Sequence, residues 1–573
     1  MAFALFTGPL AWAVVIPGVI GLLYLLRLRA LPKPFPGIPY NKEAANRIFG
    51  DINTLIKYKS RRTWFVDNAR HHNSPLFQIF FLPFAKPVIV CVDPSEVLDI
   101  SLRRTKEFKR NSLVASLFGG VIPNHHICMA DDDPRFKKNR ELVRDLMTPA
   151  FLNEVSAPQI YEKATRLVDL WTEKLRVSKG RPFAAGKDVH NLALDIILSV
   201  AFNTDPSTTN IVRNIMHFEK LAPVEEPGDE DTPVSVEPLP LGPEHHSFSA
   251  ITESIGVAFK SSFPKVRHWF LRREQHLKDA LAHKDEMTHR ELTEAARRLE
   301  EGVKPKCAMD QILLREQSIA SKEGRAPNYY SDTIKDELLG YLVGGHDTTS
   351  SSLQWGLKFL SRDQAALTRL RNDLHASFPD ARAAARPPTV TEILKTQVPF
   401  LDAIMEEMLR CSKTLPITSR EARVDTQILG HHVPKGTQVF FLAHGPGYLM
   451  PAVPIDEKTR TTDSAKSTAQ RIGVWDAENV ADFRPERWMK RAKGEDGVER
   501  GYFDANAGPF ATFGHGPRAC FGKRLAYMEM RILLCLLVWH FNLDPVKGEW
   551  DTSEPIEDLT TVPVQCYVKL REV

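Results

Sequence analysis

Hydrophobic residues fill the start of the chain without an amphipathic period. The segment from Phe3 to Leu26, FALFTGPLAWAVVIPGVIGLLYLL, contains no charged residue, and a helix of that length crosses a bilayer core of about 30 Å. A cleaved signal peptide is the alternative, but the stretch is too long for one, no basic residue precedes it, and no small-x-small site ends it. The basic segment RLRALPK follows, so the positive-inside rule places the rest of the chain in the cytosol. We therefore expect a single-pass anchor over residues 1–30.

Shorter apolar runs predict strands downstream of this segment. LFQIFFL (76–82) and KPVIVCV (86–92) are expected to pair as a hairpin. The sequence DPSE comes next, and we expect Asp93 to cap a helix with Pro94 in its first turn and Glu96 completing a capping box. Two more strands, joined by a Pro-Lys-Gly turn, are expected within residues 425–443.

Helical spacing of apolar residues dominates the middle of the chain, as in 191–202 and 269–301. Two insertions, 223–246 and 450–471, are rich in proline or small polar residues and are expected to be irregular. The pattern as a whole predicts a mainly α protein with small β-sheets. Its expected organisation is an anchor, a proline-rich linker and one large domain, over 1–30, 31–40 and 41–573.

Composition narrows the class of protein. A chain of 573 residues with 43% hydrophobic residues can bury a large core, and a net charge of +4 gives no reason to expect a nucleic-acid partner. The seven cysteines include no Cys-x-x-Cys pair, which argues against a disulfide framework or a structural zinc site. Their odd number suits a reducing compartment.

One cysteine stands in an unusual setting, FATFGHGPRACFGKRLA, which runs from Phe510 to Ala526. A free cysteine is most often a small buried hydrophobe, but that does not explain the residues around Cys520. The glycines leave the backbone bare where a large flat ligand could approach, and Arg518 could pair with a carboxylate of that ligand. An apolar helix is expected to begin just after the cysteine, and a helix N-terminus favours a thiolate, which is a soft metal ligand.

The pattern Phe-Gly-x-Gly-x-Arg-x-Cys-x-Gly resembles the haem-ligand loop of the cytochrome P450 family, with all seven fixed places filled. The resemblance implies the α-rich P450 fold, a haem b cofactor and Cys520 as the axial ligand of its iron. It also implies that this loop supplies cofactor contacts, from Phe513, Gly514, Gly516, Arg518 and Gly522.

A second segment, GGHDTTSSS, resembles the part of the family's long helix that crosses the haem. Two glycines and two threonines are poor choices for a helix interior, and a packing groove or a kink is the alternative explanation. The resemblance implies that Gly344 and Gly345 leave room for dioxygen, and that Asp347 and Thr348 form the acid–alcohol pair that delivers protons. Positions 344, 347 and 348 share one helix face.

Three further residues resemble the family's structural Glu–Arg–Arg triad. Glu407 and Arg410 lie three apart in EEMLR, and Arg487 lies in FRPERW. Taken alone, the first two are no more than a surface ion pair worth about 0.2–0.5 kcal/mol. As a triad, they are expected to hold the protein together behind the haem without taking part in catalysis.

Two arginines outside the cysteine loop match family positions that contact the haem propionates. Arg420 precedes the expected hairpin of 425–443, and Arg140 lies in DPRFKKNRELV. The family commonly has tryptophan where this chain has Phe136. The indole N–H is therefore lost, and Phe136 is expected to contribute packing alone.

The resemblance implies a monooxygenase that activates dioxygen reductively and hydroxylates or otherwise oxidises a lipophilic small molecule, an intermediate of secondary metabolism as in fungal enzymes. NADPH–cytochrome P450 reductase, with cytochrome b5 as an additional donor, is the expected partner at the endoplasmic reticulum membrane. The alternatives are oxidation of fatty acids, sterols or xenobiotics, a reductase-independent haem-thiolate isomerase, and a haem-binding sensor without turnover. Expected substrate contacts lie in SLFGGVIPNHHICMA, at Leu117, Phe118, Ile122 and His126.

Overall fold

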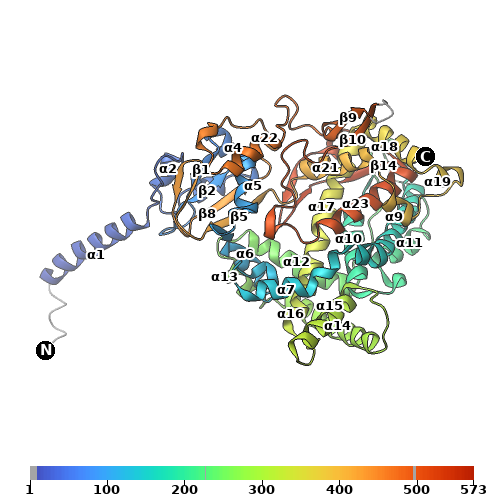
Figure 1. Cartoon of the computed structure of the whole chain (residues 1–573), viewed down its shortest axis with the longest axis horizontal. Helices are drawn as coiled ribbons and strands as arrows, with labels where there is room; N and C mark the ends of the chain where they lie inside the picture. The colour runs from blue at the N-terminus through green and yellow to red at the C-terminus, as the bar shows by residue number, and fades with distance from the viewer. Residues whose placement is uncertain (1–8, 226, 494–498) are drawn as a thin grey trace. The chain divides into compact units, whose positions relative to one another are not determined.

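The computed structural model describes residues 9–225, 227–493 and 499–573, with only the backbone described for 9–14. The chain folds into two compact units, and each is built from two separate stretches of sequence (Figure 1). Unit 1 comprises Met1–Lys109 and Pro416–Val480, and unit 2 comprises Arg110–Leu415 and Ala481–Val573. The prediction of one domain over 41–573 stays a prediction.

Unit 1 is built on a five-stranded sheet of order β1-β2-β8-β5-β3. The strands of the unit are β1 (Leu76–Ile79), β2 (Val88–Cys91), β3 (Phe108–Arg110), β5 (Ile417–Ala422), β6 (Thr426–Ile428), β7 (His431–Val433) and β8 (Gln438–Leu442). The expected hairpin is confirmed, because β1 and β2 pair antiparallel from Leu76↔Cys91 to Ile79↔Val88. β2 also pairs parallel with β8, so it is a central strand, as its continuous run of buried residues requires.

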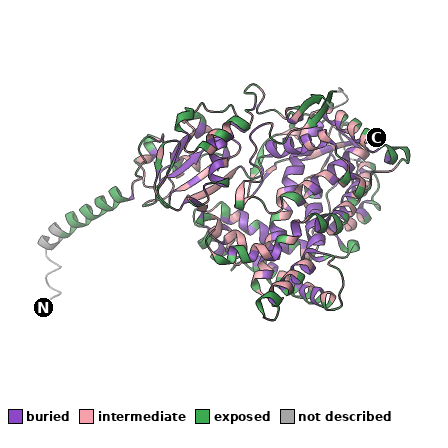
Figure 2. Ribbon diagram, in the orientation of Figure 1, coloured by how far each residue is buried: buried purple, intermediate pink, exposed green. Residues whose placement is uncertain are grey.

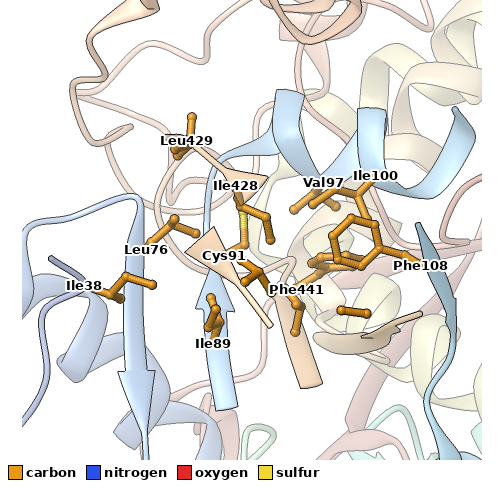
Figure 3. Packing of buried hydrophobic residues seen from close by; sticks show 13 residues of the cluster. Ile38, Leu76, Ile89, Cys91, Val97, Ile100, Phe108, Ile428, Leu429 and Phe441 are labelled. Carbon is orange, nitrogen blue, oxygen red and sulfur yellow. The ribbon is translucent and has the colours of Figure 1, made fainter. Parts of the chain in front are cut away.

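The helices of unit 1 are α1 (Pro9–Ala30), α2 (Lys42–Ala45), α3 (Ile52–Leu55), α4 (Arg61–His72), α5 (Pro94–Leu102) and α22 (Asp463–Arg471). α5 packs beside the sheet, and Figure 3 shows Val97, Ile100 and Phe108 meeting Phe441 and Cys91 in one apolar cluster. Burial of this cluster holds together segments that lie more than 300 residues apart in the sequence.

The start of α5 is as predicted, except for one side chain. The Asp93 carboxylate accepts a hydrogen bond from the Glu96 N–H at 2.8 Å, and Pro94 lies in the first turn. The reciprocal half of the capping box was wrong. The Glu96 carboxylate instead accepts hydrogen bonds from the N–H and the hydroxyl of Thr461, at 3.3 and 3.2 Å. A long-range partner therefore replaces the local one.

Two more expectations for unit 1 need correction. Residues 450–471 are not wholly irregular, because α22 begins at Asp463 with the Thr462 hydroxyl as its cap and buries Ala465 and Thr468. The segment 425–443 contains three strands, not two. β6 and β7 turn at Leu429–Gly430 to form their own ribbon, and the Pro-Lys-Gly turn leads from β7 into β8 of the large sheet.

Unit 2 is helical, as the periodicity predicts. Its helices are α6 (Ser112–Phe118), α7 (Pro134–Val143), α8 (Pro149–Phe151), α9 (Ala157–Ser178), α10 (Gly186–Phe202), α11 (Asn210–Phe218), α12 (Pro243–Phe259), α13 (Pro264–Leu271), α14 (Gln275–Glu300), α15 (Ala308–Glu323), α16 (Asp332–Gly345), α17 (Asp347–Arg362), α18 (Gln364–Ser377), α19 (Pro379–Ala383), α20 (Val390–Lys395), α21 (Pro399–Ser412) and α23 (Lys523–His540). The predicted helix over 269–301 is two helices, α13 and α14, which meet at residues 272–274.

The strands of unit 2 form small sheets: β4 (Phe183–Ala184), β9 (Met489–Lys493), β10 (Glu499–Phe503), β11 (Phe541–Asp544), β12 (Pro555–Glu557), β13 (Thr561–Pro563) and β14 (Tyr567–Glu572). The centre of the unit is made by α10, α17, α21 and α23, which are mostly buried in Figure 2. α17 packs against both α10 and α21. Asp347 and Thr348 begin α17, Cys520 lies just before α23, and Glu407 and Arg410 lie within α21.

The first helix of the chain differs from all of these in exposure. The ribbon of α1 is mostly coloured as exposed in Figure 2, and its exposed large apolar residues include Ile20 and Leu23, at 61% and 59%. Within residues 9–225, 227–493 and 499–573, no helix has both the length and the apolar character needed to cross a membrane. Residues 1–8 of the predicted anchor lie outside the described residues.

A buried carboxyl group in α23 makes folding stability depend on pH. Burial raises the pKa of Glu529 to about 8, and its Oε1 has no hydrogen-bond partner among the described residues. As the pH rises, the unfolded chain releases this proton near the ordinary pKa of about 4.3. The folded state keeps it until the pH reaches about 8. Between these values the unfolded state binds fewer protons, so the free energy of unfolding falls as pH rises, by ~1.4 kcal/mol per pH unit.

We expect Glu529→Gln to remove this slope and to stabilise the protein relative to wild type at pH 8 more than at pH 5. Chemical denaturation of both proteins at the two pH values measures the effect. Glu286→Gln, at an exposed position of α14, is the matched control and should leave the slope in place. Equal pH dependence in the wild type and the Glu529 variant would contradict the assignment.

Candidate active site

The cysteine loop is held by its own backbone. The N–H of Cys520 donates to the Phe513 carbonyl at 2.8 Å, and the N–H of Gly514 donates to the Ala511 carbonyl at 2.9 Å. Gly514 and Gly516 have φ of 61° and 71°, in the left-handed region that favours glycine. The local sequence therefore determines the loop and brings Cys520 to the N-terminus of α23.

Backbone donors next to the Cys520 sulfur could stabilise it as a metal-bound thiolate. The side chain is exposed, yet the surrounding loop still desolvates the thiol and raises its pKa. Opposing this, the backbone N–H groups of Gly522 and Lys523 and the charge of Lys523 lower the pKa of the same thiol. A metal ion that displaces the proton would leave a sulfur that already has donors from the first turn of α23.

The space around two of the predicted cofactor-contact glycines is open. A Cβ placed on Gly522 or on Gly344 would meet no atom within 4 Å among the residues described. Packing within the described protein therefore does not require glycine at either position. A soft sulfur donor together with bare backbone is what a haem face needs, so the residues present fit a cysteine-ligated haem.

Two of the arginines predicted to contact the propionates also have protein partners, and their contacts with a propionate stay predictions. Arg518 is ion-paired with Asp131, donates to the Met129 carbonyl at 2.8 Å, and stacks on Phe136 with its guanidinium carbon 3.6 Å from the ring centre. Arg140 donates to the Pro517 carbonyl at 2.6 Å and so ties α7 to the cysteine loop. Sequence reasoning missed Asp131, because nothing local marks it as a partner for a residue 387 positions away.

Arg420 belongs to unit 1, where it lies on β5 opposite Val439 of β8. Its side chain is half-buried and donates to the Ser419 carbonyl at 2.9 Å. Its predicted contact with a propionate stays a prediction.

The helix that carries the acid–alcohol pair is interrupted. α16 ends at Gly345 and α17 begins at Asp347, with His346 between them. The Thr348 hydroxyl donates to the Gly344 carbonyl at 2.9 Å, and the Asp347 carboxylate faces His190 of α10 and His346. A Cβ on Gly345 would lie 2.5 Å from Cδ1 of Ile197, so close packing against α10 already requires this glycine.

The three residues of the predicted Glu–Arg–Arg triad meet in unit 2. The Glu407 carboxylate accepts from Arg410 Nε and Nη2 at 2.8 and 2.7 Å and from Arg487 Nε at 2.9 Å. It also accepts from the Arg484 N–H at 2.8 Å and from the Trp488 indole at 2.9 Å. Sequence reasoning missed these last two donors. Glu407 is fully buried, and the hydrogen bonds that its carboxylate accepts offset the free-energy cost of burying its charge.

The predicted substrate contacts are only partly available. Leu117 and Ile122 are buried, and Phe118 is half-buried at the end of α6. The His126 ring is committed elsewhere, since its Nδ1 lies 2.7 Å from Glu337 Oε2. Burial, reinforced by the charge of Arg140, lowers the pKa of His126 to about 3 and keeps the ring neutral.

Comparison with known proteins decides the family. A family model described as Cytochrome P450 matches residues 244–448 and 455–570, which is more than half of the chain. The chain belongs to the cytochrome P450 family. The P450 heme domain in a structure titled "Crystal structure of cytochrome P450DA heme domain" has the same fold, with a TM-score of 0.65 over 95% of this chain and 98% of that one at 19% identity.

Two curated P450 relatives are more similar in sequence. Cytochrome P450 monooxygenase TRI13 of Fusarium sporotrichioides is 35% identical over 96% of this chain and 97% of its own length. The Hps1-dma1 cluster cytochrome P450 monooxygenase cyp3.1 of Dothistroma septosporum is 41% identical over 47% of this chain and 87% of its own. The chain is therefore a haem-dependent monooxygenase that uses O2, electrons from a redox partner and a lipophilic substrate.

Proposed function

We propose that Cys520 is the axial thiolate ligand of the P450 haem, and that this enzyme oxidises a lipophilic intermediate of secondary metabolism. The observation that supports this most directly is the setting of the Cys520 sulfur, next to the N–H groups of Gly522 and Lys523. When bound, the haem supplies reductive activation of O2 and transfer of one oxygen atom to the substrate. In this proposal, the loop of Phe513–Gly522 supplies the sulfur ligand, and its glycines have no side chains that would block the approach of the haem.

The proposed role of α16 and α17 is to bring protons to the dioxygen side. Thr348 has a hydroxyl that donates to the Gly344 carbonyl, and Asp347 next to it is 23% exposed and so can exchange protons with solvent. Rotation of the Thr348 hydroxyl away from Gly344 would let it donate toward bound dioxygen, with Asp347 replacing the proton. Gly344 leaves the space in which this donation takes place.

We expect Thr348→Ala to separate electron use from product formation. NADPH consumption should continue, while product per NADPH falls several-fold and hydrogen peroxide rises to match. Thr349→Ala is the matched control, because its hydroxyl makes the same kind of bond, to the Gly345 carbonyl at 3.2 Å, from a buried position. Unchanged product per NADPH in the Thr348 variant would refute the proton-relay role.

The proposed substrate class is supported by apolar residues at the expected contacts, Leu117, Phe118 and Ile122, and by a relative whose name places it in a gene cluster. Fatty acids, sterols and xenobiotics would use the same apolar contacts. Titration of the ferric enzyme with candidate lipophiles, read as a shift of its haem absorption, distinguishes these classes. Turnover without NADPH or reductase would instead support the haem-thiolate isomerase.

The proposed partners are NADPH–cytochrome P450 reductase and, as a second electron donor, cytochrome b5, at the endoplasmic reticulum membrane. The proposed anchor is the segment 1–30, supported by its uncharged run from Phe3 to Leu26 and by the exposed apolar side chains of α1. The proposed linker and catalytic domain are residues 31–40 and 41–573.

Deletion of residues 1–30 is expected to move the protein from the membrane pellet to the supernatant of fractionated cells, with its haem spectrum retained. Replacing only Arg27 and Arg29 by glutamine is the control, which keeps the apolar length. A truncated protein that still sediments with membranes would contradict the proposed anchor.

A further inference from the structure

Three side chains converge at the junction of α16 and α17. Asp347 Oδ1 lies 3.4 Å from His346 Nε2 and 3.5 Å from His190 Nδ1. One ligand atom from each of the three residues can be chosen so that all lie within 4.8 Å of one another. His190 lies near the start of α10, whereas His346 caps α17 and Asp347 begins it, so two packed helices hold the three groups in place.

The tautomer of His346 makes its second nitrogen an acceptor. His346 Nδ1 lies 3.0 Å from the Leu342 carbonyl, which can only accept, so the proton of a neutral ring is on Nδ1. The lone pair on Nε2 then faces the Asp347 carboxylate. Nε2 has no hydrogen-bond partner in the described part of the chain, and the His346 side chain is only 1% exposed. Two acceptors that face each other out of reach of water repel each other, and a cation between them would remove that repulsion.

The distances also favour a metal ion over direct hydrogen bonds. An N–H···O bond spans about 2.7–3.2 Å, which is shorter than either distance to Asp347 Oδ1. Nitrogen and oxygen ligands at about 2.0–2.1 Å from a tetrahedral ion are separated by about 3.3–3.4 Å. The spacing at Asp347 is therefore that of two ligand pairs on one ion.

A second histidine–carboxylate group in the same unit shows the contrast. Glu337 Oε2 lies 2.7 Å from His126 Nδ1, and Glu337 Oε1 accepts from the His126 N–H and from Asn139 at 2.7 and 3.0 Å. His125 Nδ1 accepts from the Ile127 N–H at 3.0 Å. The proton of a neutral His125 ring is therefore on Nε2, which lies 3.3 Å from Glu337 Oε2, so a donor faces an acceptor there. In the His190–His346–Asp347 group, by contrast, His346 Nε2 faces the Asp347 carboxylate as a second acceptor, and it has no hydrogen-bond partner among the described residues.

We propose that His190, His346 and Asp347 form a binding site for a divalent transition-metal ion, separate from the haem. Two imidazoles and one carboxylate are ligands that Zn²⁺ and its neighbours in the series accept, with water completing the coordination. Asp347 and His190 are 23% and 29% exposed at their side chains, so an ion can enter from solvent. The site holds whether or not Asp347 serves in proton delivery.

One consequence rests on the proposed function. An ion on Asp347 withholds its carboxylate from proton transfer to Thr348, so the metal inhibits the enzyme. Zinc binding and zinc inhibition are separate measurements, and therefore the site and the role of Asp347 can fail independently.

The test uses full-length, haem-loaded protein freed of other metals by a chelator that is then removed. Isothermal titration with Zn²⁺ is expected to show one saturable site, and X-ray absorption at the zinc edge should show nitrogen and oxygen neighbours at about 2.0–2.1 Å including two imidazoles. His190→Ala and His346→Gln should each weaken zinc binding by more than about 100-fold, beyond what loss of an outer-shell contact causes. His289→Ala, at an exposed position of α14, is the matched control and should bind zinc as wild type does.

The haem spectrum and helical circular dichroism of each variant establish that it is folded. No saturable zinc binding by the wild type, or equal affinity in the wild type and both histidine variants, would overturn the site. In the enzyme reconstituted with reductase, zinc should lower product per NADPH and raise hydrogen peroxide in wild type, and should have less effect on His190→Ala relative to its own zinc-free value. Stoichiometric zinc binding without this inhibition would leave the site standing and overturn its inhibitory consequence.

Discussion

Replacing Cys520 by alanine is expected to abolish turnover completely and to remove the carbon monoxide difference band that a thiolate-ligated haem gives after reduction. The reason is that Cys520 is the only cysteine or methionine within Phe510–Ala526, so no other sulfur in this loop can replace it. Cys520 follows the turn of Gly514–Ala519 and comes just before the N-terminus of α23. As the proposed ligand, the Cys520 thiolate would donate electron density to the haem iron and so favour cleavage of the O–O bond.

A second variant separates loss of the ligand from loss of the fold. Cys520→His should bind haem through imidazole and give a coloured protein whose difference band is that of a nitrogen ligand. Cys128→Ala is the matched control. Its thiol is half-buried, donates to the Ile122 carbonyl at 3.3 Å, and has a pKa raised to about 12 by burial, so it is a poor thiolate. A thiolate band that persists in Cys520→Ala would end the assignment.

Removal of the Glu407 carboxylate should have the largest effect on stability. Glu407→Ala removes the carboxylate that pairs with Arg410, which is 4% exposed, and that accepts hydrogen bonds from Arg487, Arg484 and Trp488. Breaking a buried ion pair by removing one partner costs about 3–5 kcal/mol. That is a large part of the stability of a typical domain. We expect little soluble, haem-containing protein, and a sharply lower midpoint of chemical denaturation for whatever folds.

An exposed pair provides the control for this experiment. Glu294 and Arg297 are three residues apart on α14, like Glu407 and Arg410 on α21, with Arg297 Nε 3.1 Å from Glu294 Oε2, but both side chains are about half exposed. Glu294→Ala should cost less than about 0.5 kcal/mol. Comparable losses in the two variants would show that Glu407 contributes no more than a surface ion pair.

Local signals were enough for several parts of this enzyme. The cap of α5 could be predicted because the Asp93 carboxylate and the Glu96 N–H are only three residues apart. The turn of the cysteine loop could be predicted because it needs glycines with positive φ. A separation of three residues also explains the pairing of Glu407 with Arg410 one turn later. In each case the interacting groups lie within one turn of chain, where covalent geometry limits the alternatives.

Other local expectations were wrong because distant residues competed for the same groups. Glu96 was expected to complete its own capping box, but Thr461 supplies donors from 365 residues away. α22 was missed in a segment of poor helical composition because burial of Ala465 and Thr468, which no local pattern encodes, stabilises it. Tertiary packing outweighs propensities of a few tenths of a kcal/mol per residue.

By itself, the sequence determined the family, the mainly helical class, the hairpin of β1 and β2, and the loop that presents Cys520, since these depend on short patterns and on contacts within a few residues. Only the tertiary structure decided that β8 lies between β2 and β5, that Asp131 meets Arg518, and that His190 faces Asp347. The β2–β8, Asp131–Arg518 and His190–Asp347 contacts join residues between about 150 and 400 positions apart, and their geometry is set by how helices and strands bury their apolar faces together.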